Sequence, residues 1–177
     1  MKKLSFIIIT LSCLTLCAFT FLSSIQWQPN EGAYNISFSS DKASGVIGGL
    51  KGTIDFDQNN IAASKFDVTV DANTLNTGNW LKNKHAKADD FFDVDHYPTI
   101  RFISSKIVPF NKAYKVTGNL TIKNVTKPVE IPFIFSETGN TGKFTGYFTI
   151  NKNDYLLIKT GVGDSVKIVL SIPVDKK

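Results

Sequence analysis

Hydrophobic and polar residues alternate one by one along most of the chain beyond residue 25. In the stretch 65–71, for example, Phe66, Val68 and Val70 are separated by charged or hydroxyl-bearing residues. A period of two is typical of antiparallel β-strands with one buried face and one solvated face. The same alternation runs through the segments 50–57, 65–71, 114–123, 129–135, 144–150 and 166–172.

Turn-forming residues separate these segments, notably at 57–60 and 138–142. Less regular strands are expected at 33–39, 44–49 and 99–107, which brings the total to about eight or nine. So many short strands in one domain predict an all-β sandwich or a closed barrel. The glycines between residues 45 and 52 predict bends or bulges that help such a barrel close.

One stretch departs from the period of two. In residues 77–88, Trp80, Lys84 and Lys87 are spaced three and four apart, and Thr77 stands where an N-cap residue would be expected. We predict a single short helix here. The following residues, 89–97, mix acidic and aromatic side chains and end at Pro98, which predicts an extended turn.

The first residues have the layout of a secretory signal peptide. Lys2 and Lys3 precede a run, residues 4–22, that contains no charged residue and ends near small residues. We expect residues 1–24 to be removed and residues 25–177 to form one domain, exported to a bacterial periplasm or cell surface. A retained membrane anchor and lipidation at Cys17 remain alternatives.

Composition limits the other functions. The chain has 177 residues and a formal net charge of +5, but Arg101 is its only arginine. Since nucleic-acid recognition relies heavily on arginine forks, no nucleic-acid partner is expected. With cleavage near Ser24 both cysteines, Cys13 and Cys17, are lost, so no disulfide or thiol nucleophile is expected in the mature protein.

Candidate chemistry is sparse. His85 and His96 lie among several aspartates, but their spacing matches no recognised metal motif, and a packed helix followed by a solvated acidic turn explains them. No nucleophile elbow or phosphate-cradling glycine loop occurs. We therefore expect no metal, no cofactor and no enzymatic activity.

The expected interior is rich in phenylalanine. These side chains could fill a solid core, or in a slightly wider barrel they could line a cavity for one ligand. Alternation alone leaves both alternatives open, although it predicts that Phe66, Val68, Val116, Leu120, Ile131, Phe133 and Phe148 point inward. The inward phenylalanines are expected to be Phe38, Phe56, Phe66, Phe102, Phe133, Phe135, Phe144 and Phe148.

Several motifs resemble those of the YceI-like family, exported lipocalin-like proteins associated with polyisoprenoid binding. The resemblance covers essentially the whole chain after the signal peptide. Lys152 stands where the family usually has arginine, and Leu156 where it has glycine. The matching segments are Asn73-Thr74-Leu75-Asn76, Leu81 to His85, Asp90-Phe91-Phe92-Asp93, Tyr97 to Phe102, Tyr114 to Val129, Asn151 to Leu156 and Gly163 to Val166.

This resemblance implies an eight-stranded antiparallel barrel with a short capping helix and an elongated apolar cavity. Its ligand would be an isoprenoid-type lipid such as a polyisoprenoid or an isoprenoid quinone, with transient contact to a membrane surface and an undetermined oligomeric state. The residues expected to bind the ligand are Phe38, Phe66, Val68, Trp80, His85, Phe91, Phe92, Tyr97, Arg101, Phe102, Phe133 and Phe148.

Two other functions remain open. An enzyme could act on such an amphiphile, with His85 as acid or base. A structural or stress-associated envelope protein would instead have a solid core. A cavity inside the barrel would separate the binding protein from this last alternative. Within the proposed site, His85 and Arg101 are the expected contacts for a headgroup, and the helix with residues 89–97 is expected to cap one end.

Overall fold

The computed structural model describes residues 24–158 and 163–177. The predicted signal peptide, with Cys13 and Cys17, therefore lies outside the described residues except for Ser24. In the part of the chain that is described, no helix combines the length and the apolar character needed to cross a bilayer.

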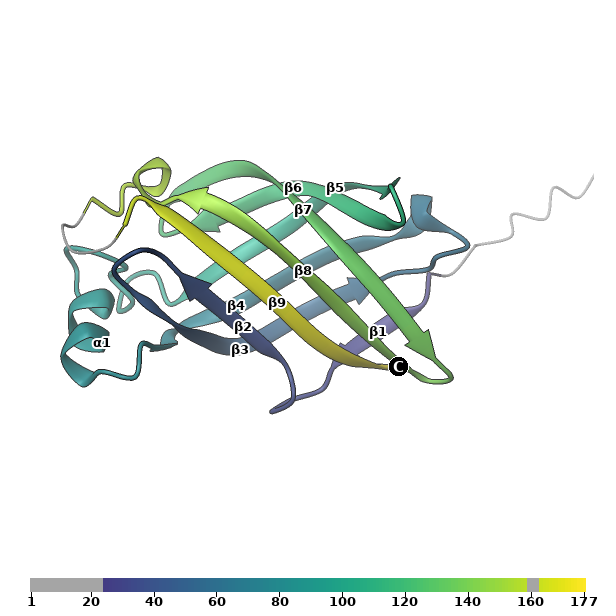
Figure 1. The fold of residues 1–177 in the computed structure, drawn as a ribbon, viewed down its shortest axis with the longest axis horizontal. Coiled ribbons are helices and arrows are strands. Elements are labelled where there is room, and N and C mark those ends of the chain that lie inside the picture. The colour runs from purple at the N-terminus through teal and green to yellow at the C-terminus, as the bar shows by residue number, and fades with distance from the viewer. Residues whose placement is uncertain (1–23, 159–162) are drawn as a thin grey trace, which may run out of the picture.

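Antiparallel strands dominate the described residues, as the alternation predicted (Figure 1). One α-helix, α1 (Trp80–Lys87), and two 3-10 turns, η1 (Ile61–Ala63) and η2 (Lys152–Tyr155), interrupt them. The strands are β1 (Gln26–Pro29), β2 (Asn35–Ser39), β3 (Ser44–Asp55), β4 (Lys65–Asn76), β5 (Thr99–Phe110), β6 (Ala113–Ile122), β7 (Val125–Thr138), β8 (Thr141–Asn151) and β9 (Ser165–Lys176).

The sheet closes into an eight-stranded barrel. From β2 to β9 each strand pairs with the next, and β9 pairs back onto β2. Strands β1 and β2 share one position between β3 and β9, because Trp27 pairs with Ile54 of β3 and Ile36 pairs with Ile47 farther along the same strand. The predicted barrel is thus confirmed, with its first strand divided in two.

Strand β1 was not among the predicted strands, although its side chains also alternate between buried and exposed. Trp27 and Pro29 are buried, whereas Gln28 between them is exposed. The indole Nε1 of Trp27 donates a hydrogen bond of 2.8 Å to the carbonyl oxygen of Phe56. This contact holds β1 over the end of the barrel that lies opposite α1 (Figure 1).

The helix is shorter than predicted, and its N-cap is a different residue. The side chain of Asn79 accepts hydrogen bonds of 3.0 Å from the backbone amides of Leu81 and Lys82, which fixes the start of α1 at Trp80. Thr77 lies two residues before Asn79, and its hydroxyl donates a hydrogen bond of 2.7 Å to Oδ1 of Asn83. Asparagine can cap as well as threonine, so spacing alone could not decide between the two.

Glycines in β3 produce the predicted irregularities. The register of β3 against β4 shifts twice between Val46 and Lys51. Gly52 has a φ of +122°, and a Cβ atom placed on it would lie 2.1 Å from the carbonyl oxygen of Asp67. The bulges bend β3 and strengthen its twist, which helps a sheet close on itself.

The barrel interior has two different halves. Toward β1 it is filled by tightly packed aromatic rings around Phe56, which has no exposed surface. Toward α1 the inward side chains are mainly aliphatic, with several phenylalanines among them, and many, such as Val68 and Ile168, are only partly buried. Such incomplete burial of inward-facing side chains indicates an interior void, because a filled core would cover them.

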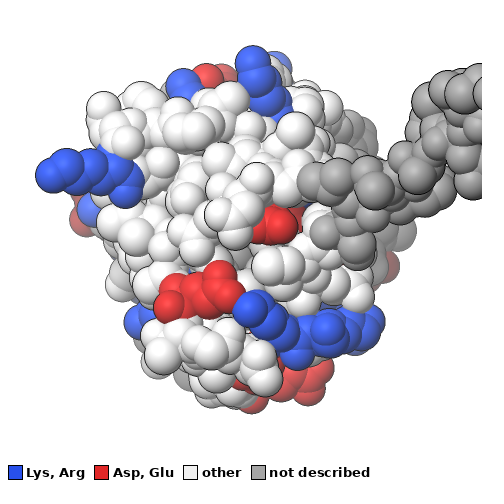
Figure 2. Space-filling model, turned by 90° about the vertical axis from the view of Figure 1, so that its right-hand side faces the viewer, with Lys and Arg blue, Asp and Glu red and all other residues white. Residues whose placement is uncertain are grey.

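Figure 2 looks onto the aromatic end. On the face shown, lysine side chains and acidic side chains are mixed with uncharged ones and are not gathered into one basic surface.

Candidate functional site

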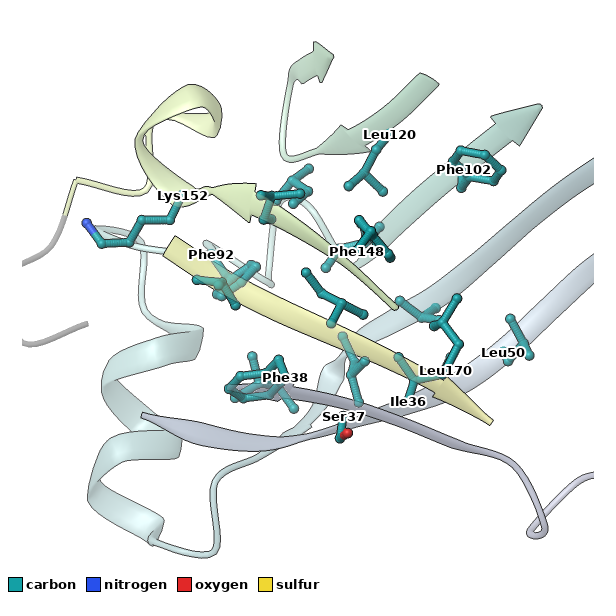
Figure 3. Close-up of a pocket in the computed structure, with 18 of the residues that line it drawn as sticks. Ile36, Ser37, Phe38, Leu50, Phe92, Phe102, Leu120, Phe148, Lys152 and Leu170 are labelled. Carbon is teal, nitrogen blue, oxygen red and sulfur yellow. The ribbon is translucent and has the colours of Figure 1, made fainter. Parts of the chain in front are cut away.

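A cavity of about 510 Å³ occupies the half of the barrel next to α1. Its wall is built from the inward positions of the strands, for example Ile36 of β2, Leu120 of β6 and Leu170 of β9 (Figure 3). All seven residues predicted to point inward line this cavity, so the predicted register is confirmed. The interior is therefore neither uniformly solid nor uniformly open.

Three aromatic rings form the floor of the cavity. Phe66 of β4, Phe133 of β7 and Phe144 of β8 have ring centroids 5.7–5.8 Å apart in every pairing. Phe56 lies against all three at 5.5–6.2 Å, and it does not line the cavity. The rings meet edge-on or tilted, which is the preferred packing of aromatic side chains.

The mouth lies at the opposite end and is framed by three segments. These are the turn between β2 and β3, the helix α1, and the residues from η2 to Leu157. Exposed residues of the first two segments, such as Lys42 and Lys82, also line the cavity, so it reaches the surface there. Phe92 and Phe38 lie near this opening in Figure 3.

The turn after α1 carries two aromatic residues of the wall. Phe91 is buried, and its ring meets that of Phe92 edge-on at 5.1 Å. The backbone amide of Phe92 donates to the carbonyl oxygen of Ala86 at 3.1 Å, which ties the turn to the helix. The helix and the turn together therefore cap part of the barrel end, as the sequence predicted.

Lys152 joins η2 to Leu157 and Asp164 at the mouth. Its stem lines the cavity, while its ammonium group points away from the interior (Figure 3). The Nζ atom donates to the carbonyl oxygen of Leu157 at 3.1 Å and to Asn153 Oδ1 at 3.0 Å, and it pairs with Asp164 at 3.3 Å. Hydrogen bonds from Asn153 and Lys152 hold the pKa of Asp164 below its usual value.

The ionisable side chains that line the cavity are three lysines and one histidine. They are Lys42, Lys82, His85 and Lys152, and no aspartate or glutamate is found among the described lining residues. Lys42, Lys82 and His85 are exposed and belong to the mouth, while the deeper wall carries apolar side chains. The site can accordingly hold an apolar group inside and a polar or anionic group at the opening.

Most of the residues predicted to bind a ligand line this cavity. They come from five strands, from α1 and from the turn that follows it, and they meet only because the barrel closes. The lining members are Phe38, Phe66, Val68, His85, Phe91, Phe92, Phe102, Phe133 and Phe148.

Arg101, Trp80 and Tyr97 do not line the cavity. Arg101 lies on the outer face of β5, where its guanidinium donates two hydrogen bonds of 2.8–2.9 Å to the carboxylate of Asp67. Its neighbour Phe102 takes the inward position, so the pleat of the strand turns Arg101 outward. This pairing, led by the hydrogen bond from Arg101, lowers the pKa of Asp67.

Trp80 and Tyr97 lie at the same end of the barrel but outside the cavity. Trp80, the first residue of α1, is 75% exposed. Tyr97 is half-buried, and the Nζ atom of Lys123 lies 5.8 Å from its ring centroid. Neither side chain therefore forms part of the cavity wall.

The structure adds lining residues that the predicted set did not contain. Most of the strand members have the same period of two and could have been found by extending each alternating run. Ile47 and Leu50 are three residues apart because β3 is bulged between them. Lys152 and Leu157 follow β8 and reach the mouth through tertiary contacts that no local pattern indicates. The added residues include Ile36, Ile47, Leu50, Val70, Ile100, Ile122, Ile150, Lys152, Leu157, Ile168 and Leu170.

The acidic turn carries an ion pair. His96 Nδ1 lies 2.7 Å from Asp93 Oδ1, and this hydrogen bond raises the pKa of His96. Within residues 24–158 and 163–177, no three histidine, cysteine or acidic side chains come together in a group that could hold a metal ion.

Comparison with known proteins agrees with this architecture. The model of the YceI-like domain matches residues 26–174. A UPF0312 protein of Yersinia enterocolitica is 31% identical over 136 residues, which cover 72% of this chain and 71% of the relative. A UPF0312 protein of Vibrio campbellii is 33% identical over 135 residues, with the same coverage of both chains.

Solved structures share the barrel. The crystal structure of BcnA from Burkholderia cenocepacia superposes with a TM-score of 0.78 at 25% identity and covers 82% of this chain and 99% of its own. A polyisoprenoid binding domain from Saccharophagus degradans has a TM-score of 0.66 over 88% of this chain and 99% of its own, and at 14% identity it shows the fold alone. The matched domain and these relatives establish that the chain belongs to the YceI-like family.

Proposed function

We propose that this protein binds a lipid-like molecule with a long apolar tail, of the polyisoprenoid or isoprenoid-quinone type. The observation that carries the proposal is the apolar cavity of about 510 Å³ that opens at the end of the barrel next to α1. Its volume lies in the range of small-molecule binding sites. Its apolar wall can pack against an apolar tail, which water solvates poorly. Each CH₂ group removed from water contributes about 0.8 kcal/mol, so a long tail gains strongly from entering.

Two further facts support the isoprenoid class. The chain belongs to the YceI-like family, and one structural neighbour is described as a polyisoprenoid binding domain. The wall is lined mainly by branched aliphatic and phenyl side chains, which can pack around the methyl branches of an isoprenoid chain.

The polar end of the ligand would remain at the mouth. Lys42, Lys82 and His85 lie there, so a hydroxyl, quinone or anionic headgroup would meet hydrogen-bond donors while it stays in contact with water. Arg101, which the sequence predicted as a headgroup contact, instead donates hydrogen bonds to Asp67 on the outside of the barrel.

We propose binding and not catalysis. The imidazole of His85 at the mouth is the candidate acid or base, but it is exposed, and the tail would be buried among side chains without acid–base chemistry. His85→Ala is therefore expected to change headgroup preference and to leave tail binding intact. Turnover of a bound isoprenoid that disappears in His85→Ala would instead establish the enzyme.

We further propose that the protein is exported and acts in the bacterial periplasm or at the cell surface. The support is the basic start and the uncharged run of residues 4–22. Intact-mass analysis of the protein from cell fractions is expected to give a chain that begins near Ile25. A mass that still includes Cys17 would contradict cleavage and favour an anchor or a lipidated cysteine.

Transient contact with a membrane would allow cargo exchange. Trp80, Leu156 and Ile158 are 61–75% exposed, and they lie within or next to the segments that frame the mouth. Helix α1 adds lysines and no acidic residue, which favours an anionic surface. Flotation with phosphatidylglycerol-containing vesicles is expected to weaken in Trp80→Ser and not in Tyr147→Ser, which removes an exposed ring from the barrel wall.

The direct test of the proposed function is mass spectrometry of an organic extract from natively purified protein, followed by titration of the delipidated protein with geranylgeraniol. Phe92→Asp places a charge on the cavity wall at the mouth and is expected to abolish uptake. Ile134→Asp is the matched control, because Ile134 is 57% exposed on the outer face of β7. Equal uptake by folded Phe92→Asp and wild type would overturn the assignment of the mouth.

A further inference from the structure

The floor of the cavity lies inside the barrel and not at its end. Phe66, Phe133 and Phe144 form a triangle of rings that spans the lumen, with Phe56 behind it. Phe135 and Tyr114 continue the packing behind this layer, at 5.0 Å each from Phe56. A tail that enters from the mouth therefore meets a closed wall.

Strand register fixes this wall firmly. Phe66 pairs with Ile54, Phe133 with Gly146, and Phe144 with Ile172, so each ring belongs to a continuous ladder. Moving the wall along the barrel would need a shift of two residues in a strand, because a shift of one turns the ring outward. The depth of the cavity is thus set by the sequence positions of three residues.

The volume above the floor limits the size of the tail. Benzene fits in an engineered cavity of about 150 Å³, which corresponds to about 25 Å³ for each carbon. The cavity of about 510 Å³ therefore holds about 20 carbons, or about four isoprene units. The paired acyl chains of a common phospholipid contain more carbon than this, so the cavity fits a single tail.

We propose that the layer of Phe66, Phe133 and Phe144 sets the maximum tail length that the protein encloses, so that it selects single-tailed isoprenoid amphiphiles of about four units. This inference rests on the proposed function, since it assumes that a tail occupies the cavity. Within that function, it assigns length specificity to three residues. The simplest alternative is that the rings only stabilise the core.

The experiment is a titration of the delipidated protein with prenols of one headgroup and increasing length: geraniol, farnesol, geranylgeraniol and solanesol. Each additional enclosed CH₂ is worth about 0.8 kcal/mol, or about fourfold in Kd. Affinity is therefore expected to rise up to geranylgeraniol and then to stop rising, because the extra units of solanesol remain outside.

Phe66→Ala opens the floor from the side of β4. It removes a ring of six carbons, so the preferred tail is expected to lengthen by about one isoprene unit. Phe135→Ala is the matched control, because it removes a ring from the same cluster, 4.5 Å from Phe144, without lining the cavity. If Phe66→Ala does not fold, Phe66→Leu gives a smaller opening, and Phe66→Trp is expected to shorten the preferred tail.

The outcomes separate the two proposals. A plateau in wild type that shifts in Phe66→Ala and not in Phe135→Ala supports the length limit. Binding that rises steadily through solanesol, or an identical preference in both variants, overturns the limit while the binding function stands. Absence of binding for every prenol overturns both.

Discussion

The rings of Phe66 and Phe144 lie 5.7 Å apart although their strands, β4 and β8, stand four positions apart in a ring of eight. They meet across the full width of the barrel, and their planes are inclined at 82°. Together with Phe133 they divide the interior into a packed half and an open half. The same contact thus stabilises the barrel and bounds its cavity.

Phe133→Ala is expected to lower the free energy of unfolding by about 3–5 kcal/mol, the cost of removing a well-packed aromatic side chain. Phe133 is 5% exposed and contacts Phe56, Phe66, Tyr114 and Phe144. Urea unfolding monitored by circular dichroism measures the change. A loss under 1 kcal/mol would show that Phe133 is not part of a packed layer.

Ile168→Phe fills space in the open half and should have the opposite effect. A ring that occupies part of the void is expected to raise the free energy of unfolding of the empty protein by about 0.5–2 kcal/mol. It should also weaken binding of geranylgeraniol.

The control is Val169→Phe. Val169 is the next residue of β9 and is 39% exposed on the outer face, so its effect should stay within about 0.5 kcal/mol and leave binding unchanged. Equal effects of the two substitutions would mean that Ile168 does not face a void.

Gly52→Ala tests the bulged strand β3. Gly52 combines a φ of +122° with a predicted approach of 2.1 Å between a Cβ atom and the Asp67 carbonyl, so alanine must displace backbone. We expect a loss of at least about 2 kcal/mol. Gly139 also has a positive φ, +60°, but a Cβ there meets nothing within 4 Å. Gly139→Ala should therefore cost only about 1 kcal/mol, measured by the same unfolding titration.

Lys152→Met keeps the buried stem but removes the ammonium group that joins Leu157, Asn153 and Asp164. The carbonyl oxygen of Leu157 then loses a charge-assisted hydrogen bond, which costs about 1–3 kcal/mol of local stability. Hydrogen exchange of the amides of Leu156 and Leu157 should accelerate by about tenfold or more.

The matched variant for this test is Lys115→Met, which breaks the pair of Lys115 with Glu130 at 3.0 Å on the barrel wall. It should not alter exchange at the mouth. Unchanged exchange in Lys152→Met would show that the mouth is held by other contacts.

Because of Tyr155, we expect the protein to lose stability at alkaline pH. Burial, with a smaller contribution from Asp154, raises the pKa of the Tyr155 hydroxyl from 10.0 to about 12. Between these values the unfolded chain has lost the proton and the folded chain retains it, so the free energy of unfolding falls as pH rises. Below pH 10 this effect is absent.

Tyr155→Phe removes the titrating group, and the buried hydroxyl has no hydrogen-bond partner among the described residues. The variant should match or exceed wild-type stability at neutral pH and lose less between pH 8 and about pH 11 in urea unfolding. The common titration of lysines cancels in this difference. Parallel curves for the two proteins would contradict the raised pKa.

Periodicity alone determined much of the fold. Alternation placed the strands and the face on which Phe66, Val68 and Phe133 lie, because a side chain in a strand can point to only two sides. It failed where the local signal was short or ambiguous. Strand β1 has only four residues, and Asn79 competed with Thr77 as the cap of α1.

The tertiary structure determined whether the interior is solid or contains a cavity. The sequence could not choose between a solid core and a cavity, since the same phenylalanines suit both. The choice depends on where rings from β4, β7 and β8 fall along the barrel axis once β3 and β4 pair and close the sheet. Three rings at one level fill the lumen, whereas the levels above them, which are mainly aliphatic, leave it open.

Closure of the barrel also determined where the charged residues Arg101 and Lys152 lie and which partners they have. Arg101 follows a lining residue by number but points to the outside, where Asp67 of the neighbouring strand binds it. Lys152 lies outside any alternating run, yet the turn after β8 brings it to the mouth. Local sequence fixes which face a strand residue occupies, but the partners of that face come from residues distant in the chain, and only the closed barrel brings them together.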